Sequence, residues 1–220
     1  CAADPAGSAF INVTQTLTLA GRLAERDIST LFLSTNQVFD GQAPHMPADA
    51  PRAPVSEYGR QKAKAEAGLE RLMEAGAPVA VLRLSKIVSP AMALVCGWVR
   101  ALKSGEPIRP FTDMALAPVE TRLTVQAIAA LMRARVPGIF QLTGPTDVTY
   151  EAAARYIAGS IGADTALIEP VPAASAGMPP GATPRHTTLD CRALADRFGI
   201  VAPGPWAVID RIVANAEPVN

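Results

Sequence analysis

The sequence has few cysteines and histidines, no excess charge and no long hydrophobic run. Its 220 residues carry 20 Lys and Arg against 20 Asp and Glu, which argues against nucleic acid or an anionic membrane as the main partner. The longest apolar stretch, residues 92–99, is too short to span a bilayer. Three widely spaced cysteines fit neither a disulfide framework nor a zinc site, so no metal is expected. Because no basic segment followed by an apolar one opens the sequence, we expect a cytoplasmic protein.

Short apolar runs alternate with amphipathic segments along the chain. Residues 30–34 have the length and composition of a buried strand, and the next such run follows after loop and helix signals. A spacing of roughly 25 to 40 residues between strands is typical of βαβ crossovers, and so predicts a parallel sheet. The other expected strands are 78–85, 138–144 and a short one at 166–171; the expected helices are 8–27 with Ser8 as N-cap, 62–74, 125–135, 149–161, 189–200 and 205–216. Proline-rich loops are expected at 42–55 and 170–184.

Two of the expected strands end in hydroxyl residues. Ser34 and Thr35 close the first strand, and Ser85 closes the second. Ligands of open parallel sheets bind outside the carboxyl ends of the strands, so if these strands are neighbours, both ends face one crevice. Ordinary turn chemistry also places Ser and Thr at strand ends, and this alternative stays open.

Tyr58 and Lys62 lie four residues apart at the start of a helical segment, and so share one face. A free phenol has a pKa near 10, and a neighbouring ammonium lowers it toward the range useful for proton transfer. An exposed pair making a small surface contact is the alternative. Together with Thr35, the pair predicts proton transfer on a carbonyl or alcohol oxygen, with hydride transfer to or from a nicotinamide as the partner process.

Three stretches carry a family resemblance: LSTNQVFDG at 33–41, APVSEYGRQKAKAE at 53–66 and VAVLRLSKIV at 79–88. They resemble the extended short-chain dehydrogenase/reductase superfamily, and within it the dTDP-4-dehydrorhamnose reductases and related sugar-nucleotide-binding proteins. Those proteins carry Ser-Thr-Asp-Tyr-Val-Phe-x-Gly, then Tyr-Gly-x-x-Lys, then a Leu-Arg strand. The resemblance implies an α/β fold: a Rossmann-like doubly wound parallel sheet with a smaller C-terminal substrate-binding lobe.

The resemblance also implies an activity and a set of site residues. It points to an NAD(P)-dependent reductase of a nucleotide-linked 4-keto-6-deoxysugar, with NADP or NAD as cofactor. Thr35 would hold the substrate carbonyl, Tyr58 would donate the proton, and Lys62 would lower the Tyr58 pKa and bind the nicotinamide ribose. The remaining implied contacts are Asn36 and Arg185 to the substrate, and Ala2, Ala3, Leu84 and Ser85 to the cofactor.

Two departures from the family pattern leave the substrate open. Asn36-Gln37 replaces the Asp-Tyr of the reductases, and Lys86-Ile87 replaces a more aromatic segment. Asparagine at the position of Asn36 also occurs in the regulatory β subunit of methionine adenosyltransferase. A non-catalytic binding subunit and a sugar-nucleotide epimerase or dehydratase therefore remain alternatives, and a homodimer is possible.

The glycine-rich turn that holds the cofactor pyrophosphate in this superfamily does not occur in the sequence. We therefore expect an N-terminally truncated core, with residues 30–34 as an exposed apolar edge and weak cofactor affinity. The expected division assigns 1–85 and 123–146 to the dinucleotide-binding core, and 86–122 and 147–220 to the substrate-binding lobe.

Overall fold

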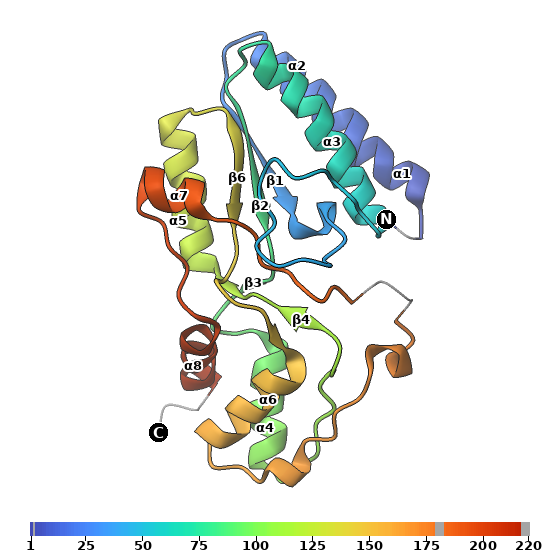
Figure 1. Cartoon of the computed structure of the whole chain (residues 1–220), viewed down its shortest axis with the longest axis vertical. Helices are drawn as coiled ribbons and strands as arrows, with labels where there is room; N and C mark the ends of the chain where they lie inside the picture. Colours follow the sequence, from blue (N-terminus) through green and yellow to red (C-terminus); the bar gives the residue numbers. More distant parts are fainter. Residues whose placement is uncertain (2, 179–182, 217–220) are drawn as a thin grey trace.

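A three-stranded parallel sheet forms the centre of the upper body in Figure 1. The computed structural model describes residues 1, 3–178 and 183–216. The strands are β1 (Thr30–Thr35), β2 (Val79–Leu84) and β6 (Gly138–Leu142), in the order β1-β2-β6. All pairs are parallel, and Thr35 lies opposite Leu84 at the carboxyl end. This confirms the expected α/β architecture with βαβ crossovers.

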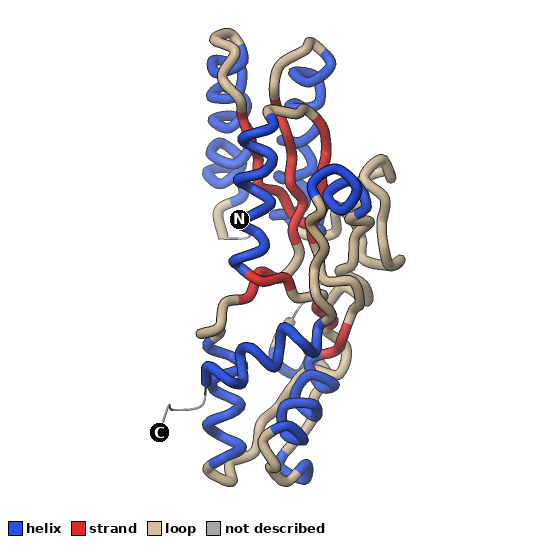
Figure 2. Tube along the Cα trace, turned by 90° about the vertical axis from the view of Figure 1, so that its left-hand side faces the viewer, coloured by secondary structure: helices blue, strands red, loops and turns tan. Residues whose placement is uncertain are grey.

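Helices cover both faces of the sheet. As a consequence, every side chain of the central strand β2 is buried. On one face, Val79 and Val81 pack with Ala20 and Leu69 of the helices that run beside β1. These are α1 (Pro5–Ala9), the π-helical turn η1 (Phe10–Gln15) and α2 (Thr16–Ala24), which follow one another directly, together with α3 (Glu57–Glu74). On the other face, Leu82 and its neighbours pack against α5 (Thr121–Ala134) and α7 (Arg192–Phe198). Figures 1 and 2 show the sheet between these two helical layers.

A second apolar cluster forms the lower body in both figures. It is built around Trp98, Ile157 and Ile209, one from each of three helices. The helices are α4 (Ala93–Lys103), α6 (Tyr150–Ser160) and α8 (Pro205–Ala216). Four two-residue strands lie between the two bodies: β3 (Ile87–Val88) pairs with β5 (Val119–Glu120), and β4 (Ala115–Leu116) pairs with β7 (Val148–Thr149).

The helix α7 packs with the sheet rather than with this second cluster. Leu194 lies among the buried side chains around β2 and β6, and Phe198 contacts Phe140 with ring centroids 6.1 Å apart. The expected division assigns 147–220 to the lobe, whereas α7 within that range packs on the sheet; the division itself stays a prediction. Amphipathic periodicity identifies the helix but not the surface it covers.

Several local details differ from the expectations. The first helix is capped by Asp4, whose carboxylate accepts from the Gly7 amide, so Ser8 is not the N-cap. The helix α3 begins at Glu57 and so includes the Tyr58–Lys62 pair, which was expected at the start of a helix, ahead of the strongly helical stretch 62–74. Residues 166–171 form no strand: a 3-10 turn η3 (Thr165–Leu167) leads into single bridges at Ile168 and Val171.

The strand β1 lies at the edge of the sheet, with β2 as its only partner among the described residues. Leu33 on this strand is 42% exposed, as expected for an apolar edge. Within the described ranges, no helix combines the length and the apolar character that crossing a membrane requires.

Candidate active site

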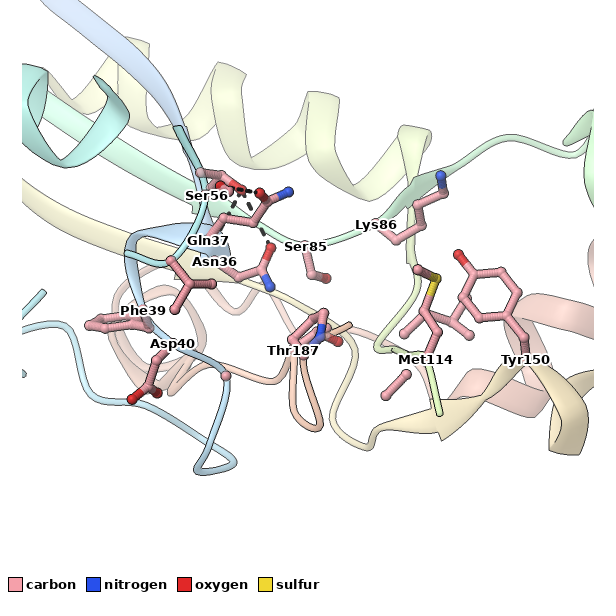
Figure 3. Close-up of a pocket in the computed structure, with 16 residues that line it drawn as sticks. Asn36, Gln37, Phe39, Asp40, Ser56, Ser85, Lys86, Met114, Tyr150 and Thr187 are labelled. Atoms are coloured by element: carbon pink, nitrogen blue, oxygen red, sulfur yellow. Dashed lines mark hydrogen bonds between the residues drawn. The ribbon is translucent and has the colours of Figure 1, made fainter. Parts of the chain in front are cut away.

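A cavity of about 250 Å³ lies where the carboxyl ends of β1 and β2 meet the lower body. Thr35, Asn36 and Ser85 form its wall on the sheet side. The opposite wall includes Met114, Tyr150 and Thr187, which come from segments far along the chain (Figure 3). The position agrees with the rule that open parallel sheets bind ligands beyond their carboxyl edge.

The two hydroxyls that close β1 have different surroundings. Ser34 points into the core and donates a 2.5 Å hydrogen bond to Glu66 Oε1. Thr35 lines the cavity, and its oxygen accepts from the Gln37 amide at 3.2 Å, capping the 3-10 turn η2 (Asn36–Val38). Because Thr35 is only 6% exposed, its hydroxyl is held at the cavity wall by the fold.

The start of α3 is fixed against η2 by short contacts. Ser56 is the N-cap, accepting from the Gly59 amide at 3.0 Å and donating to Gln37 Oε1 at 2.9 Å. A Cβ atom at Gly59 would lie 2.2 Å from the Gln37 carbonyl oxygen, so only glycine allows this approach. Tyr58 precedes Gly59, and its backbone position therefore follows from the contact with η2.

Lys62 lies between the edge strand and Tyr58. Its Nζ donates to the Leu33 carbonyl at 2.8 Å and lies 4.3 Å from the ring centroid of Phe32. The same atom is 5.7 Å from the ring centroid of Tyr58, so the predicted pairing on one helix face is present. The pair stands beside the cavity and does not line it.

The pKa values of the two groups differ from the expectation. Burial raises the pKa of Tyr58, and burial lowers the pKa of Lys62 against an opposing effect of the Glu66 charge. The lowered Tyr58 pKa predicted from the sequence is therefore wrong for this arrangement. The physical reason is that the ammonium is directed to the backbone carbonyl of Leu33 rather than to the phenol oxygen.

The other predicted cofactor and substrate residues differ in where they lie. Ser85 lines the cavity and donates to the Ala117 carbonyl at 2.5 Å, whereas the neighbouring Leu84 is buried in the sheet core. Ala3 and Arg185 are exposed and lie outside the cavity wall. The prediction for Ala2 falls outside the described residues.

A buried ion pair supports the strand ends from below. Arg83 in β2 donates to Glu66 in α3 at 2.8 Å, and both side chains are at most 1% exposed. Burial acts to raise the pKa of Glu66, but the hydrogen bonds and charge of Arg83, with hydrogen bonds from Ser34 and Arg52, hold it below its ordinary value. Arg83 also donates to Gln141 of β6 at 3.1 Å, which links α3, β2 and β6. In the sequence, only the position of Arg83 within the apolar run 79–85 indicates that a buried charge partner is needed.

A second carboxylate holds the loop on the opposite wall. Asp147 accepts from the Thr187 amide at 2.7 Å, from the Thr187 and Thr188 hydroxyls, and contacts His186 Nδ1 at 3.1 Å. Burial acts to raise the Asp147 pKa, and these hydrogen bonds outweigh it and lower the pKa. Nothing in the local sequence pairs residue 147 with residues 186–188, so sequence reasoning missed this contact.

Across the described part of the chain, no group of three His, Cys, Asp or Glu side chains is arranged to hold a metal ion. The polar groups that line the cavity are hydroxyls, amides, the Tyr150 phenol, the Lys86 ammonium and the Asp40 carboxylate. All but the carboxylate can donate hydrogen bonds to oxygen atoms, and a phenol can also transfer a proton.

The chain matches a known family and several known proteins. The profile of the RmlD substrate binding domain matches residues 1–216. The probable low-salt glycan biosynthesis reductase Agl14 of Haloferax volcanii is 28% identical over 211 residues, covering 92% of this chain and 69% of that protein. The dTDP-4-keto-6-deoxy-D-glucose reductase of Streptomyces niveus is 31% identical over 157 residues, covering 70% of this chain and 54% of that protein. The chain thus spans about half the length of the Streptomyces relative.

Solved structures share the fold. The dTDP-4-dehydrorhamnose reductase of Bacillus anthracis, in complex with NADP, superposes with a TM-score of 0.77 at 18% identity, covering 92% of this chain and 71% of that one. The dTDP-glucose 4,6-dehydratase of the same organism, in complex with NAD, gives a TM-score of 0.78 at 18% identity, covering 93% and 67%. At these identities the likeness establishes a Rossmann-like α/β fold.

Proposed function

Since the chain belongs to the RmlD substrate binding domain family of extended short-chain dehydrogenases/reductases, we propose that it acts as an NAD(P)-dependent reductase of a nucleotide-linked 4-keto-6-deoxysugar. One observation carries the proposal: Thr35 lines the cavity, and the adjoining turn η2 holds the first turn of α3, which bears Tyr58. A hydroxyl for the carbonyl oxygen and a phenol for the proton are therefore positioned by one local structure. The 31% identical reductase of Streptomyces niveus supports the sugar-nucleotide class.

The residues at the strand ends fit the nicotinamide side of NADP or NAD. The ammonium of Lys62 is a hydrogen-bond donor for a ribose or carboxamide, and the hydroxyl oxygens of Tyr58 and Ser85 can accept, since the Ser85 O–H is donated to the Ala117 carbonyl. Lys62 uses one of its three donors on the Leu33 carbonyl at the exposed edge. The chemistry that the cofactor supplies when bound is the hydride that reduces the carbonyl carbon.

The protein side of the reaction is proton delivery to the carbonyl oxygen. Thr35 donates a hydrogen bond to that oxygen and holds it in place. The Tyr58 hydroxyl then gives its proton to the oxygen as negative charge develops there, completing the alcohol. A raised pKa keeps Tyr58 protonated at neutral pH, as a proton donor must be. Because the Lys62 ammonium bonds the Leu33 carbonyl and does not lower the Tyr58 pKa, its role in this proposal is to bind the nicotinamide ribose.

Replacing Tyr58 tests the proposal. Tyr58→Phe removes the proton donor, so keto-sugar-dependent NADPH oxidation should fall by about 10²–10⁴-fold, while NADPH binding stays nearly intact. Tyr156→Phe is the matched control, because that phenol bonds Asp210 and stacks on Trp206 outside the cavity. Equal activity of Tyr58→Phe and the unmodified protein would refute the catalytic proposal.

A non-catalytic sugar-nucleotide-binding role is the second candidate. Asn36 favours it, since this amide lines the cavity where reductases of the family carry an acidic residue. That role predicts binding of a nucleotide sugar without turnover by the unmodified protein, and an epimerase predicts turnover without net NADPH consumption. A cytoplasmic location, a homodimer and the absence of nucleic acid partners also stay predictions.

A further inference from the structure

The lobe end of the cavity carries a cation that no other group neutralises. Lys86 follows Ser85 just beyond β2, and it is the one basic side chain in the cavity wall. Its ammonium forms no hydrogen bond or ion pair with any other residue that the structure describes. The acidic residue of the wall, Asp40, lies toward the opposite end in Figure 3. Lys86 is therefore available to a negatively charged ligand.

A phenol lies at the same end. Tyr150 begins α6, and its amide donates to the Met114 carbonyl at 3.1 Å. Its ring packs edge-on against Trp98 and Phe111, with centroids 6.3 Å and 6.4 Å away. These contacts hold the ring, while its hydroxyl has no hydrogen-bond partner among the described residues. Burial raises the Tyr150 pKa, so the group is a neutral hydrogen-bond donor at physiological pH.

We propose that Lys86 and Tyr150 form an oxyanion-binding subsite, which holds a negatively charged group of the substrate. The inference rests on the proposed function and deepens it, because it assigns a specific part of the ligand to this end of the cavity. Figure 3 shows Lys86 and Tyr150 together on the right, away from Asn36, Gln37 and Ser56. The substrate would thus have its carbonyl at Thr35 and its anionic oxygens at the lobe end.

The chemistry of the subsite favours oxygens that carry charge over neutral hydroxyls. An ammonium attracts an anion at hydrogen-bond distance, and a phenol adds a directed donor to the same oxygen atoms. Lys86 is exposed, so salt screens this attraction, and the affinity for an anion should fall as the salt concentration rises. Two parts of a sugar nucleotide have this chemistry: the diphosphate, and a carboxylate on an acidic sugar.

Binding measurements on charge-removing variants test the subsite. Thymidine diphosphate and glucuronate are titrated separately by calorimetry into the protein and into Lys86→Gln, at low and at raised salt. We expect Lys86→Gln to weaken binding of one probe at least tenfold and to reduce its salt dependence. Lys86→Arg should retain most of the affinity, and Tyr150→Phe should weaken binding several-fold. The probe that responds identifies the source of the anion.

Lys64→Gln is the matched control, since Lys64 is an exposed lysine of α3 outside this cavity. It should bind both probes like the unmodified protein. Two results would overturn the inference. One is that Lys86→Gln binds each probe as tightly as the unmodified protein does, and the other is that the unmodified protein binds neither probe. The titrations need no cofactor and no turnover, so a failure of the reductase proposal, seen with Tyr58→Phe, is recorded separately.

Discussion

The two adjacent residues at the end of β1 have different roles: Ser34 bonds a buried carboxylate, and Thr35 lines the cavity. Ser34 and Thr35 look equivalent in the sequence, although only Thr35 was assigned to the substrate. Because successive side chains of a strand point to opposite faces, only one of them can face the ligand crevice. Ser34 instead bonds Glu66, which lies 32 residues further along the chain. The hydroxyl at the strand end was predictable from the sequence, but the partner that takes Ser34 into the core depends on tertiary packing.

Alanine substitutions should separate these two tasks. Thr35→Ala removes the hydrogen bond to the substrate oxygen, so kcat/KM for carbonyl reduction should fall about 10- to 1,000-fold. Loss of the cap on η2 should also cost about 0.5–2 kcal/mol of unfolding free energy. Ser34→Ala takes one donor from a buried carboxylate and should cost about 1–3 kcal/mol of unfolding free energy, with activity largely retained. Steady-state kinetics and urea unfolding of both variants provide the measurement. The reverse pattern would contradict the assignment of Thr35 to the substrate.

The helix α3 illustrates what local sequence signals establish and what they omit. Strong helix formers identify residues 62–74, and the Tyr58–Lys62 spacing places the start of the helix near Tyr58, close to the observed Glu57. The start is set by tertiary contacts, because Ser56 bonds Gln37 and the backbone of Gly59 touches the same residue. These contacts bring Tyr58 to the cavity region.

Adding one methyl group at Gly59 tests this role of the helix start. The Cβ of Gly59→Ala would lie 2.2 Å from the Gln37 carbonyl oxygen, so the first turn of α3 must move. We expect a loss of about 1–3 kcal/mol in unfolding free energy and a fall in kcat, because Tyr58 moves with the turn. Gly97→Ala in α4 is the control: no atom lies within 4 Å of the added Cβ, and stability should rise by about 0.5–1 kcal/mol. Unchanged activity in Gly59→Ala would show that the contact does not position Tyr58.

The pairing of α3 with β2 through Glu66 and Arg83 makes stability depend on pH. Folding lowers the pKa of Glu66 below its ordinary value of 4.5. The carboxylate therefore contributes its full stability at pH values above 4.5, and this contribution is lost as the pH falls through the folded pKa. Glu66→Gln leaves Arg83 buried without its charge partner and should cost about 3–5 kcal/mol at neutral pH. It should also flatten the stability profile in the acid range.

The neighbouring pair Arg52 and Glu70 provides the comparison. Glu70 is 33% exposed, and Glu70→Gln should change stability by at most about 1 kcal/mol. Denaturant unfolding of both variants gives the measurement. The pH should run from roughly 3 to roughly 7, because this range brackets the ordinary carboxylate pKa of about 4. An equal acid dependence in Glu66→Gln and the unmodified protein would exclude Glu66 as the titrating group.

The cavity belongs to the whole molecule, because its two walls come from segments that lie far apart in the chain. The sheet wall was predictable, since Thr35, Asn36 and Ser85 follow strands that apolar patterning reveals. The lobe wall was not, because Met114, Tyr150 and Thr187 meet only through the packing of distant segments. The strand pair β4–β7 brings two of these segments together, and a two-residue strand leaves no periodic signal in the sequence.

Asp147 connects that lobe wall to the core, and its removal should loosen the cavity. Asp147→Ala leaves the Thr187 amide and two threonine hydroxyls without their acceptor, so the loop that carries Thr187 should lose order. We expect KM for the sugar nucleotide to rise several-fold with a smaller change in kcat, and amide exchange at Thr187 to accelerate.

The lowered pKa keeps Asp147 ionised at neutral pH. In the unmodified protein the contact therefore weakens only as pH falls through the folded pKa, below the ordinary value of 3.8. Asp164→Ala is the control, because Asp164 caps the turn η3 away from the cavity. If both variants gave the same KM, the loop contact would have no part in substrate binding.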